Sequence, residues 1–177
     1  MNASMSLLVR ARAFMPGSLP VAGACIGLLA LAAPALAEDG KTMPGSACHA
    51  SFSSGVASLT RSNGLMLGVG SSGVRISCPV MKDIDAGRIK RAVVNVIDNN
   101  PFAGGDVVCN LLTLKPDGTV SQSQELRTSG SSGTMRQLAY GAQAKVAGGN
   151  YSLVCDLPAL QSPGGPSMII SYNVVEE

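Results

Sequence analysis

The sequence has few of the side chains on which most enzymes depend. It contains no tryptophan, three phenylalanines, three tyrosines and a single histidine in 177 residues. Any Ser-His-Asp or Cys-His site would have to use that histidine, His49, which directly follows Cys48. No G-x-S-x-G motif is present either. We therefore interpret His49 as a surface residue, and we expect no catalytic residue of these types, no cofactor, and a core built from aliphatic side chains.

The chain also lacks an excess of either charge once its N-terminus is set aside. Of its 13 lysines and arginines, two lie in the first 37 residues, whereas all 11 acidic residues lie beyond them. The remainder is formally neutral, so the sequence predicts no basic face for nucleic acid or acidic lipid. About 140 residues remain, which is enough for one domain with its own core.

The only long apolar run lies near the N-terminus. Two arginines precede an apolar stretch over residues 21–33, and residues 35–37 read Ala-Leu-Ala, a small-x-small cleavage site. We predict that residues 1–37 are a signal peptide and that the mature chain, starting at Glu38, is secreted or periplasmic and has no membrane span. A membrane anchor is disfavoured because two glycines and a proline interrupt a run shorter than the roughly 18–20 residues of a span. Lipid attachment at Cys25 is disfavoured because Cys25 lies inside the run.

Four cysteines remain in the mature chain: Cys48, Cys78, Cys109 and Cys155. An even number in an exported chain indicates a disulfide framework, although four cysteines allow three pairings. We favour Cys48–Cys78 and Cys109–Cys155. The residues two before and two after Cys109 and Cys155 are apolar, which places both thiols toward the core. A zinc site is disfavoured because no C-x-x-C pair occurs.

Strand patterns follow one another along the mature chain, and no stretch beyond the leader has a helical period. The clearest strand is residues 89–98, which are rich in β-branched side chains. Further strands are expected at residues 48–52, 65–69, 74–78, 107–114, 119–128, 134–140, 151–157 and 168–175. Residues 119–128 are polar on both faces and are expected at a sheet edge. The prediction is an all-β domain, an antiparallel two-sheet sandwich of about eight strands with jelly-roll or Greek-key connections.

Two segments are expected to lack regular structure for most of their length. Residues 38–47 are polar and contain a proline and two glycines, so we expect a flexible N-terminal arm before a disulfide-braced domain over residues 48–177. Residues 53–73 are rich in glycine and serine, so we expect loops there with only the one short strand at residues 65–69.

Five short motifs follow one another in a fixed order: PGSAC at residues 44–48, Cys78-Pro79, Cys109-x-Leu111, YxLxCxLP at residues 151–158, and SYxV at residues 171–174. In this order they resemble a family of small uncharacterised exported bacterial β-sandwich proteins. The resemblance implies a secreted, disulfide-bonded β-sandwich. It supplies no activity and no site residue.

Two loops carry the residues most suited to contact a ligand. They are Asp83 and Asp85 in one loop, and Asp98, Asn99, Asn100 and Phe102 in the other. Hard oxygen ligands suit calcium, so a site at Asp83, Asp85 and Asp98 is an alternative, although the EF-hand spacing is absent because its twelfth position is Val94. Turn chemistry is favoured over metal binding, because Asp and Asn side chains commonly bond to the backbone of their own turns.

Sugar binding and sugar hydrolysis set different demands on the residues. A sugar-binding platform needs exposed aromatic rings, and the strand alternation points Tyr151 and Tyr172 inward, leaving Phe102 and Tyr140 as the expected surface rings. Hydrolysis needs two carboxylates facing each other across a groove, about 5–10 Å apart. The turn residues that could supply them are Asp83, Asp85, Asp98, Asp106 and Asp117.

We therefore expect a non-enzymatic secreted or periplasmic β-sandwich protein with a binding, adhesive or structural role. Its partner would be a protein or a polysaccharide outside the inner membrane, and not a nucleic acid. The alternative is a carbohydrate-binding module or a weak glycan hydrolase that uses loop carboxylates.

Overall fold

The computed structural model describes residues 38–52, 58–83, 87–130 and 133–177. The predicted signal peptide and Asp85 lie outside the described residues. Within these ranges, no helix is long and apolar enough to cross a membrane. The described chain consists mainly of β-strands, and the 3-10 turn η1 (Gly45–Ala47) follows the first of them.

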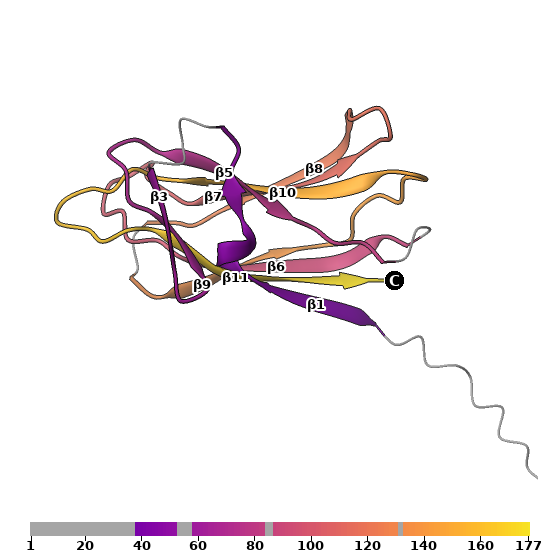
Figure 1. Ribbon diagram of the computed structural model, residues 1–177, viewed down its shortest axis with the longest axis horizontal. Helices are drawn as coiled ribbons and strands as arrows, with labels where there is room; N and C mark the ends of the chain where they lie inside the picture. Colours follow the sequence, from indigo (N-terminus) through magenta and orange to yellow (C-terminus); the bar gives the residue numbers. More distant parts are fainter. Residues whose placement is uncertain (1–37, 53–57, 84–86, 131–132) are drawn as a thin grey trace, which may run out of the picture. The chain divides into compact units, whose positions relative to one another are not determined.

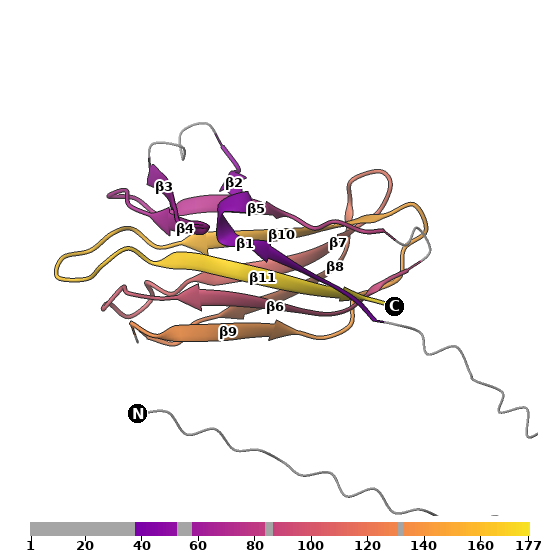
Figure 2. The ribbon, with the colours of Figure 1, turned by 60° about the horizontal axis from the view of Figure 1, so that its bottom comes forward.

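The strands form two antiparallel sheets that lie face to face (Figure 1, Figure 2). Sheet A has the order β3 (Leu59–Ser62), β4 (Leu65–Gly68), β11 (Met168–Glu176), β6 (Ile89–Ile97) and β9 (Met135–Tyr140), and β1 (Asp39–Pro44) also pairs with β11. Sheet B has the order β2 (His49–Ala50), β5 (Val74–Pro79), β10 (Asn150–Leu157), β7 (Val108–Leu114) and β8 (Val120–Arg127). Between β5 and β11, every connection except the β7–β8 hairpin crosses between sheets, as in jelly rolls. The predicted all-β sandwich is confirmed, with eleven described strands in place of about eight.

Strand β6, predicted from its β-branched residues, lies inside sheet A between β11 and β9. Its side chains alternate between the two faces of the sheet. Ala92, Val94 and Val96 are at most 3% exposed and pack into the core, whereas Lys90 and Arg91 are exposed. The core lies between the sheets and is built mainly from such aliphatic residues.

Both disulfides of the favoured pairing are present, Cys48–Cys78 and Cys109–Cys155, and all four cysteines are at most 1% exposed. Cys109 on β7 and Cys155 on β10 are direct cross-strand partners, with Cα atoms 4.0 Å apart. The alternation of apolar residues around each cysteine accounts for this placement, because it turns both thiols to the inner face of sheet B.

The expectation of a flexible arm over residues 38–47 is wrong. Residues Asp39–Pro44 form β1, which pairs along its whole length with β11, from Asp39 opposite Glu176 to Pro44 opposite Ser171. Gly45 then passes so close to β11 that a Cβ atom there would lie 2.0 Å from the Ile169 carbonyl oxygen. The partner strand lies more than 120 residues further along the chain, so local composition does not reveal the pairing.

A hairpin also replaces part of the loop expected over residues 53–73. β3 pairs with β4 through a two-residue turn, in which Asn63 has φ 49° and Gly64 has φ 82°. Positive φ at both central residues defines a type I′ turn, for which Asn-Gly is the preferred sequence. The Asn63-Gly64 pair is therefore the sequence signal that would have predicted this hairpin.

Strand β8 lies at an edge of sheet B, as its polar pattern predicted. It folds back from β7 through Lys115–Gly118, where the Gly118 N–H donates to the Lys115 carbonyl over 2.9 Å. Side chains on β8 also reach the segment that follows β9: Gln124 donates to the Ala142 carbonyl, and Gln122 accepts from the Ala144 N–H. These bonds partly cover the edge.

All three tyrosines are buried, so the expectation of an exposed Tyr140 is wrong. Tyr140 lies two residues after Leu138 on β9 and shares its inward face. The hydroxyl of Tyr140 donates to the Cys109 carbonyl over 2.8 Å, and that of Tyr172 donates to the Pro79 carbonyl over 2.8 Å. Tyr151 donates to the Ala144 carbonyl over 3.1 Å. Burial is the main cause that raises the pKa of each tyrosine.

Candidate functional site

One end of the sandwich, here called the loop end, carries the β6–β7 connection (residues 98–107) and the β10–β11 connection (residues 158–167) (Figure 1). Strands β5 and β7 begin at this end, and β6, β8 and β10 end there, since their neighbours run antiparallel. Both termini of the described chain lie at the opposite end, where Asp39 pairs with Glu176.

A groove of about 580 Å³ opens at the loop end. We call it the loop-end groove. Its walls come from the start of β5, the end of β10, the β6–β7 connection and the segment after β2. Its lining residues are Phe52, Ser58, Ser72, Gly73, Val74, Arg75, Gly104, Asp106, Val108, Asp156, Leu157 and Pro158.

The groove includes a row of side chains on the outer face of sheet B. Asp156 on β10 lies directly opposite Arg75 on β5 and Val108 on β7. Arg75 donates from Nε to Oδ1 of Asp156 over 2.8 Å and from Nη2 to Oδ2 over 2.9 Å. The hydrogen bonds and charge of Asp156 raise the pKa of Arg75. The result is a planar pair of charged groups, with side chains 54% and 39% exposed.

Phe52 lines the same groove and is 66% exposed, the largest value among the exposed large hydrophobic residues of the described chain. It follows β2, four residues after the disulfide-bonded Cys48. The sequence predicts Phe52 only as the last residue of a short strand at residues 48–52, and not as a site residue. The available signal was its position directly before a serine- and glycine-rich stretch.

A second, shallower depression of about 430 Å³ adjoins the groove. We call it the Phe102 depression, because the ring of Phe102 is 54% exposed within its lining. Its lining residues are Asn100, Phe102, Ala103, Gly104, Gly105, Pro158, Ala159 and Gln161. Gly104 and Pro158 line both spaces, so the two adjoin each other.

The predicted ligand-contacting residues of the β6–β7 connection have two different roles. Asp98 is fully buried, and its carboxylate accepts hydrogen bonds from the N–H groups of Asn100 (3.0 Å) and Val107 (3.3 Å). It also accepts from the hydroxyls of Ser167 (3.1 Å) and Thr128. Asp98 therefore ties together the β6–β7 connection, the residue after β8 and the residue before β11, and is placed to organise the loop end.

Asn99 and Asn100 continue this network toward the surface. Asn99 donates from Nδ2 to the Pro166 carbonyl over 2.9 Å, which fastens the β10–β11 connection. Asn100 accepts from the Phe102 N–H over 2.9 Å. Of the predicted residues in this loop, Asn100 and Phe102 line the depression.

The structure does not bring Asp83 and Asp98 together. They lie beyond opposite ends of β6, whose nine residues span roughly 30 Å at the usual rise of a strand. Among the described residues, no group of three or more His, Cys, Asp or Glu side chains could hold a metal ion. The alternative of a calcium site at Asp83, Asp85 and Asp98 is therefore wrong, because it placed the two loops next to each other. Asp117 caps its own turn by accepting from the Thr119 N–H, which lowers its pKa.

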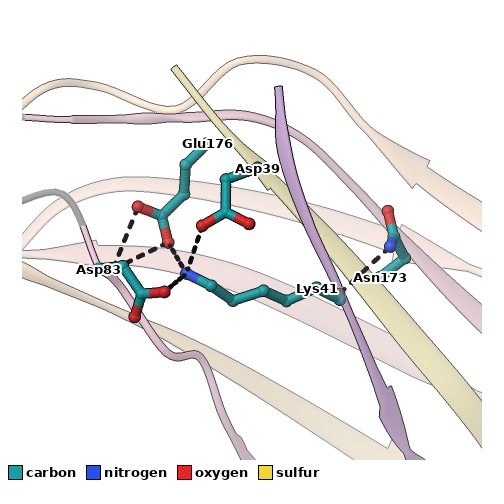
Figure 3. Close-up of polar contacts among 5 residues, drawn as sticks. All are labelled: Asp39, Lys41, Asp83, Asn173 and Glu176. Atoms are coloured by element: carbon teal, nitrogen blue, oxygen red, sulfur yellow. Dashed lines mark hydrogen bonds and ion pairs between the residues drawn. The ribbon is translucent and has the colours of Figure 1, made fainter. Parts of the chain in front are cut away.

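Asp83 instead belongs to a charge cluster at the end of the sandwich opposite the groove (Figure 3). Lys41 Nζ lies 2.8 Å from Glu176, 2.9 Å from Asp83 and 3.4 Å from Asp39. The side chain of Glu176 is 1% exposed, and that of Lys41 is 18% exposed. Burial lowers the pKa of Lys41, but its hydrogen bonds to the three carboxylates outweigh burial, so the pKa is raised. The cluster fastens β1 to the end of β11.

Comparison with known proteins adds only distant structural likenesses. No family model matches the chain, and no curated protein matches it. A family two carbohydrate esterase from Cellvibrio japonicus has a TM-score of 0.44 and 8% identity over 79% of this chain and 34% of its own. A family 35 carbohydrate binding module from Clostridium thermocellum has a TM-score of 0.43 and 10% identity, over 77% of this chain and 97% of its own.

A Podospora anserina β-(1,4)-mannanase with a CBM35 module has a TM-score of 0.41 and 13% identity. The likeness covers 78% of this chain and 28% of the mannanase. The present chain thus spans about a third of the length of the esterase and less of the mannanase.

Proposed function

We propose that this chain is an exported, non-catalytic β-sandwich protein that binds a polysaccharide in the loop-end groove. The observation that carries the proposal is an exposed aromatic ring in the same groove as a planar hydrogen-bonding pair. Phe52 supplies the ring, and Arg75 with Asp156 supplies the pair. A pyranose ring has an apolar face that stacks on an aromatic ring and hydroxyls that bond to such polar groups.

The exposure of Phe52 supports a binding role. A phenyl ring that is 66% exposed contributes little to folding, because most of its surface stays in water. Exposed apolar surface that lines a concave space together with a few polar groups is typical of a ligand site. Val108 and Pro158, which are half-buried, extend this surface.

Export is supported by the cysteines. Two disulfides are typical of proteins in oxidising compartments, such as the periplasm or the extracellular medium. Together with the predicted signal peptide over residues 1–37 and the resemblance to small exported bacterial β-sandwich proteins, they support a location outside the inner membrane, where polysaccharide partners occur.

Hydrolysis is the second candidate, because Asp106 and Asp156 line the same groove. A glycosidase needs one carboxyl group that donates a proton and another that attacks or activates water. Both oxygens of Asp156 accept hydrogen bonds from Arg75, and Oδ1 of Asp106 accepts from the Gly130 N–H over 3.2 Å. Carboxylates held in this way are suited to positioning a ligand, so binding without hydrolysis is favoured.

A glycan array probed with residues 38–177 tests the proposal. We expect retention on at least one polysaccharide, no release of reducing ends, and affinity about five- to tenfold weaker for Phe52→Ala. Met81→Ala is the matched control, since Met81 is 57% exposed and lies beyond the other end of β5. An empty array, or full affinity in Phe52→Ala, would overturn the proposal. If the native protein releases reducing ends and Asp106→Asn abolishes this release, the protein is a hydrolase instead.

A further inference from the structure

We infer that the Phe102 depression is a second subsite, so that the groove takes an internal stretch of a neutral, linear polysaccharide. This inference rests on the proposed function and adds the class of ligand. A single site at Phe52 would be enough for one sugar or a chain end. A ligand that extends past Gly104 to Phe102 must contain further sugar units beyond the one at Phe52.

The junction between the two spaces is open. Gly104 lines both of them and has φ 84°, a left-handed conformation that favours glycine. A Cβ atom built at Gly104 would meet nothing within 4 Å, so this position borders open space. Because glycine has no side chain, nothing at position 104 rises between the groove and the Phe102 depression.

The main chain of Phe102 is held in place, although its side chain stays in water. Asn100 is 6% exposed and accepts from the Phe102 N–H over 2.9 Å, while the Gly105 N–H donates to the Phe102 carbonyl over 3.1 Å. Buried Asp98 accepts in turn from the Asn100 N–H. Fixing the loop that carries an exposed phenyl ring adds little buried apolar surface to the fold. It does reduce the conformational entropy that the loop would lose when a ligand binds there, which is the expected gain from a prearranged contact.

The chemistry of the lining points to an uncharged sugar. Among the described residues that line the Phe102 depression, the polar side chains are the amides of Asn100 and Gln161, and none is charged. In the groove beside it, Arg75 and Asp156 neutralise each other, and the remaining charged group among its described lining residues is the Asp106 carboxylate, which disfavours an anionic sugar. Neutral amides beside an aromatic ring suit hydroxyl groups better than carboxylates or sulfates, whose charge would be left unpaired.

Titration calorimetry with neutral linear oligosaccharides tests the inference. The probes are cello-, xylo-, manno- and galacto-oligosaccharides, each from disaccharide to hexasaccharide. For at least one series we expect affinity to rise about tenfold or more with length. We expect Phe102→Ala to weaken hexasaccharide binding about five- to tenfold and to leave disaccharide binding unchanged, whereas Phe52→Ala weakens both. Met81→Ala, with exposure similar to Phe102, should change neither.

Three outcomes would overturn the inference: equal affinity for disaccharide and hexasaccharide, full hexasaccharide affinity in Phe102→Ala, or no binding of any series. Its failure is distinct from failure of the proposed function. A protein that binds short sugars through Phe52, or that retains only a charged or branched polysaccharide on the array, would keep the function and lose the second subsite. Thermal unfolding of each variant confirms that the exposed ring was removed from a folded protein.

Discussion

Lys41 on β1 places its ammonium group 2.8 Å from the carboxylate of Glu176 on β11, and the Glu176 side chain is 1% exposed. The main-chain N–H of Asp83 also points at this carboxylate, at 3.2 and 3.3 Å from its two oxygens. A carboxylate removed from water needs such partners, because an uncompensated buried charge is costly. The pair therefore connects the first strand of the described chain to the last.

Replacing Lys41 by methionine should lower the free energy of unfolding by about 2 kcal/mol. This loss is smaller than that for a fully buried ion pair, because Lys41 is partly exposed and the Asp83 N–H still donates to Glu176. Urea denaturation followed by circular dichroism measures the change. Lys90→Met is the matched control, since Lys90 pairs with Glu38 at the surface and should leave the midpoint unchanged. Equal midpoints for Lys41→Met and the native protein would show that the cluster does not fasten β1.

The raised pKa of Lys41 predicts how this contribution depends on pH. Below the ordinary lysine value of about 10.4, Lys41 is protonated in both the folded and the unfolded chain, and the contribution is fully present. As pH rises from there through the folded-state pKa, the unfolded chain releases its proton first, and the contribution is lost. The difference in unfolding free energy between the native protein and Lys41→Met should therefore shrink above about pH 10.4. A difference that grows in that range would contradict the assigned role.

The tyrosines should titrate late in the folded protein. Burial raises the pKa of Tyr172 to about 12, and it also raises the pKa values of Tyr140 and Tyr151. The folded protein should show little tyrosinate absorbance near pH 10, where the chain unfolded in urea should already ionise. Because the chain has no tryptophan, the near-ultraviolet difference spectrum reports these three rings directly. A native titration midpoint near pH 10 would contradict their burial.

Removing the Asp98 carboxylate should loosen the loop end. Asp98→Ala leaves the Asn100 N–H and two hydroxyls without this acceptor in a fully buried position, at a cost of about 3 kcal/mol. The Val107 N–H keeps its second acceptor, Thr128 Oγ1, at 2.9 Å. Asp117→Ala is the control, because Asp117 caps an exposed turn and should change stability little. Hydrogen exchange should rise first at Asn100 in Asp98→Ala. Unchanged exchange there would show that other bonds hold the connection.

Each disulfide should contribute separately to stability. Cys109 and Cys155 close a loop of 46 residues and Cys48 and Cys78 one of 30, so each bond should stabilise the fold by about 3–4 kcal/mol in the chain-entropy model. Calorimetry of the Cys48→Ala/Cys78→Ala and Cys109→Ala/Cys155→Ala double variants should give a lower Tm for both. Peptide mapping without reductant should recover the same two cross-links, and a Cys48–Cys155 peptide would contradict the pairing.

Features governed by neighbours in sequence were predictable. β-branched residues mark β6, and alternation places Cys109 and Cys155 on an inner face. Features governed by distant partners were not. Strand β1 is polar by composition and is ordered by β11, and Tyr140 is buried because β9 packs its inner face against sheet B.

For the candidate site, too, features set by sequence neighbours could be predicted and features set by distant partners could not. Asp98, Asn100 and Phe102 were identified from the sequence as one loop, but composition does not show that the first is buried and the last exposed. Phe52 became a site residue only because the fold places the segment after β2 beside the ends of β5 and β10. A groove formed by four separate segments has no local sequence pattern.

The antiparallel pairing of β1 with β11, with Asp39 opposite Glu176, has a practical consequence for immobilisation. A tag or linker joined to either terminus of residues 38–177 is attached at the end of the sandwich opposite the groove. A sensor chip loaded through either terminus would thus present the end that carries the groove to the flowing solution, and the two orientations of attachment should report the same binding curve.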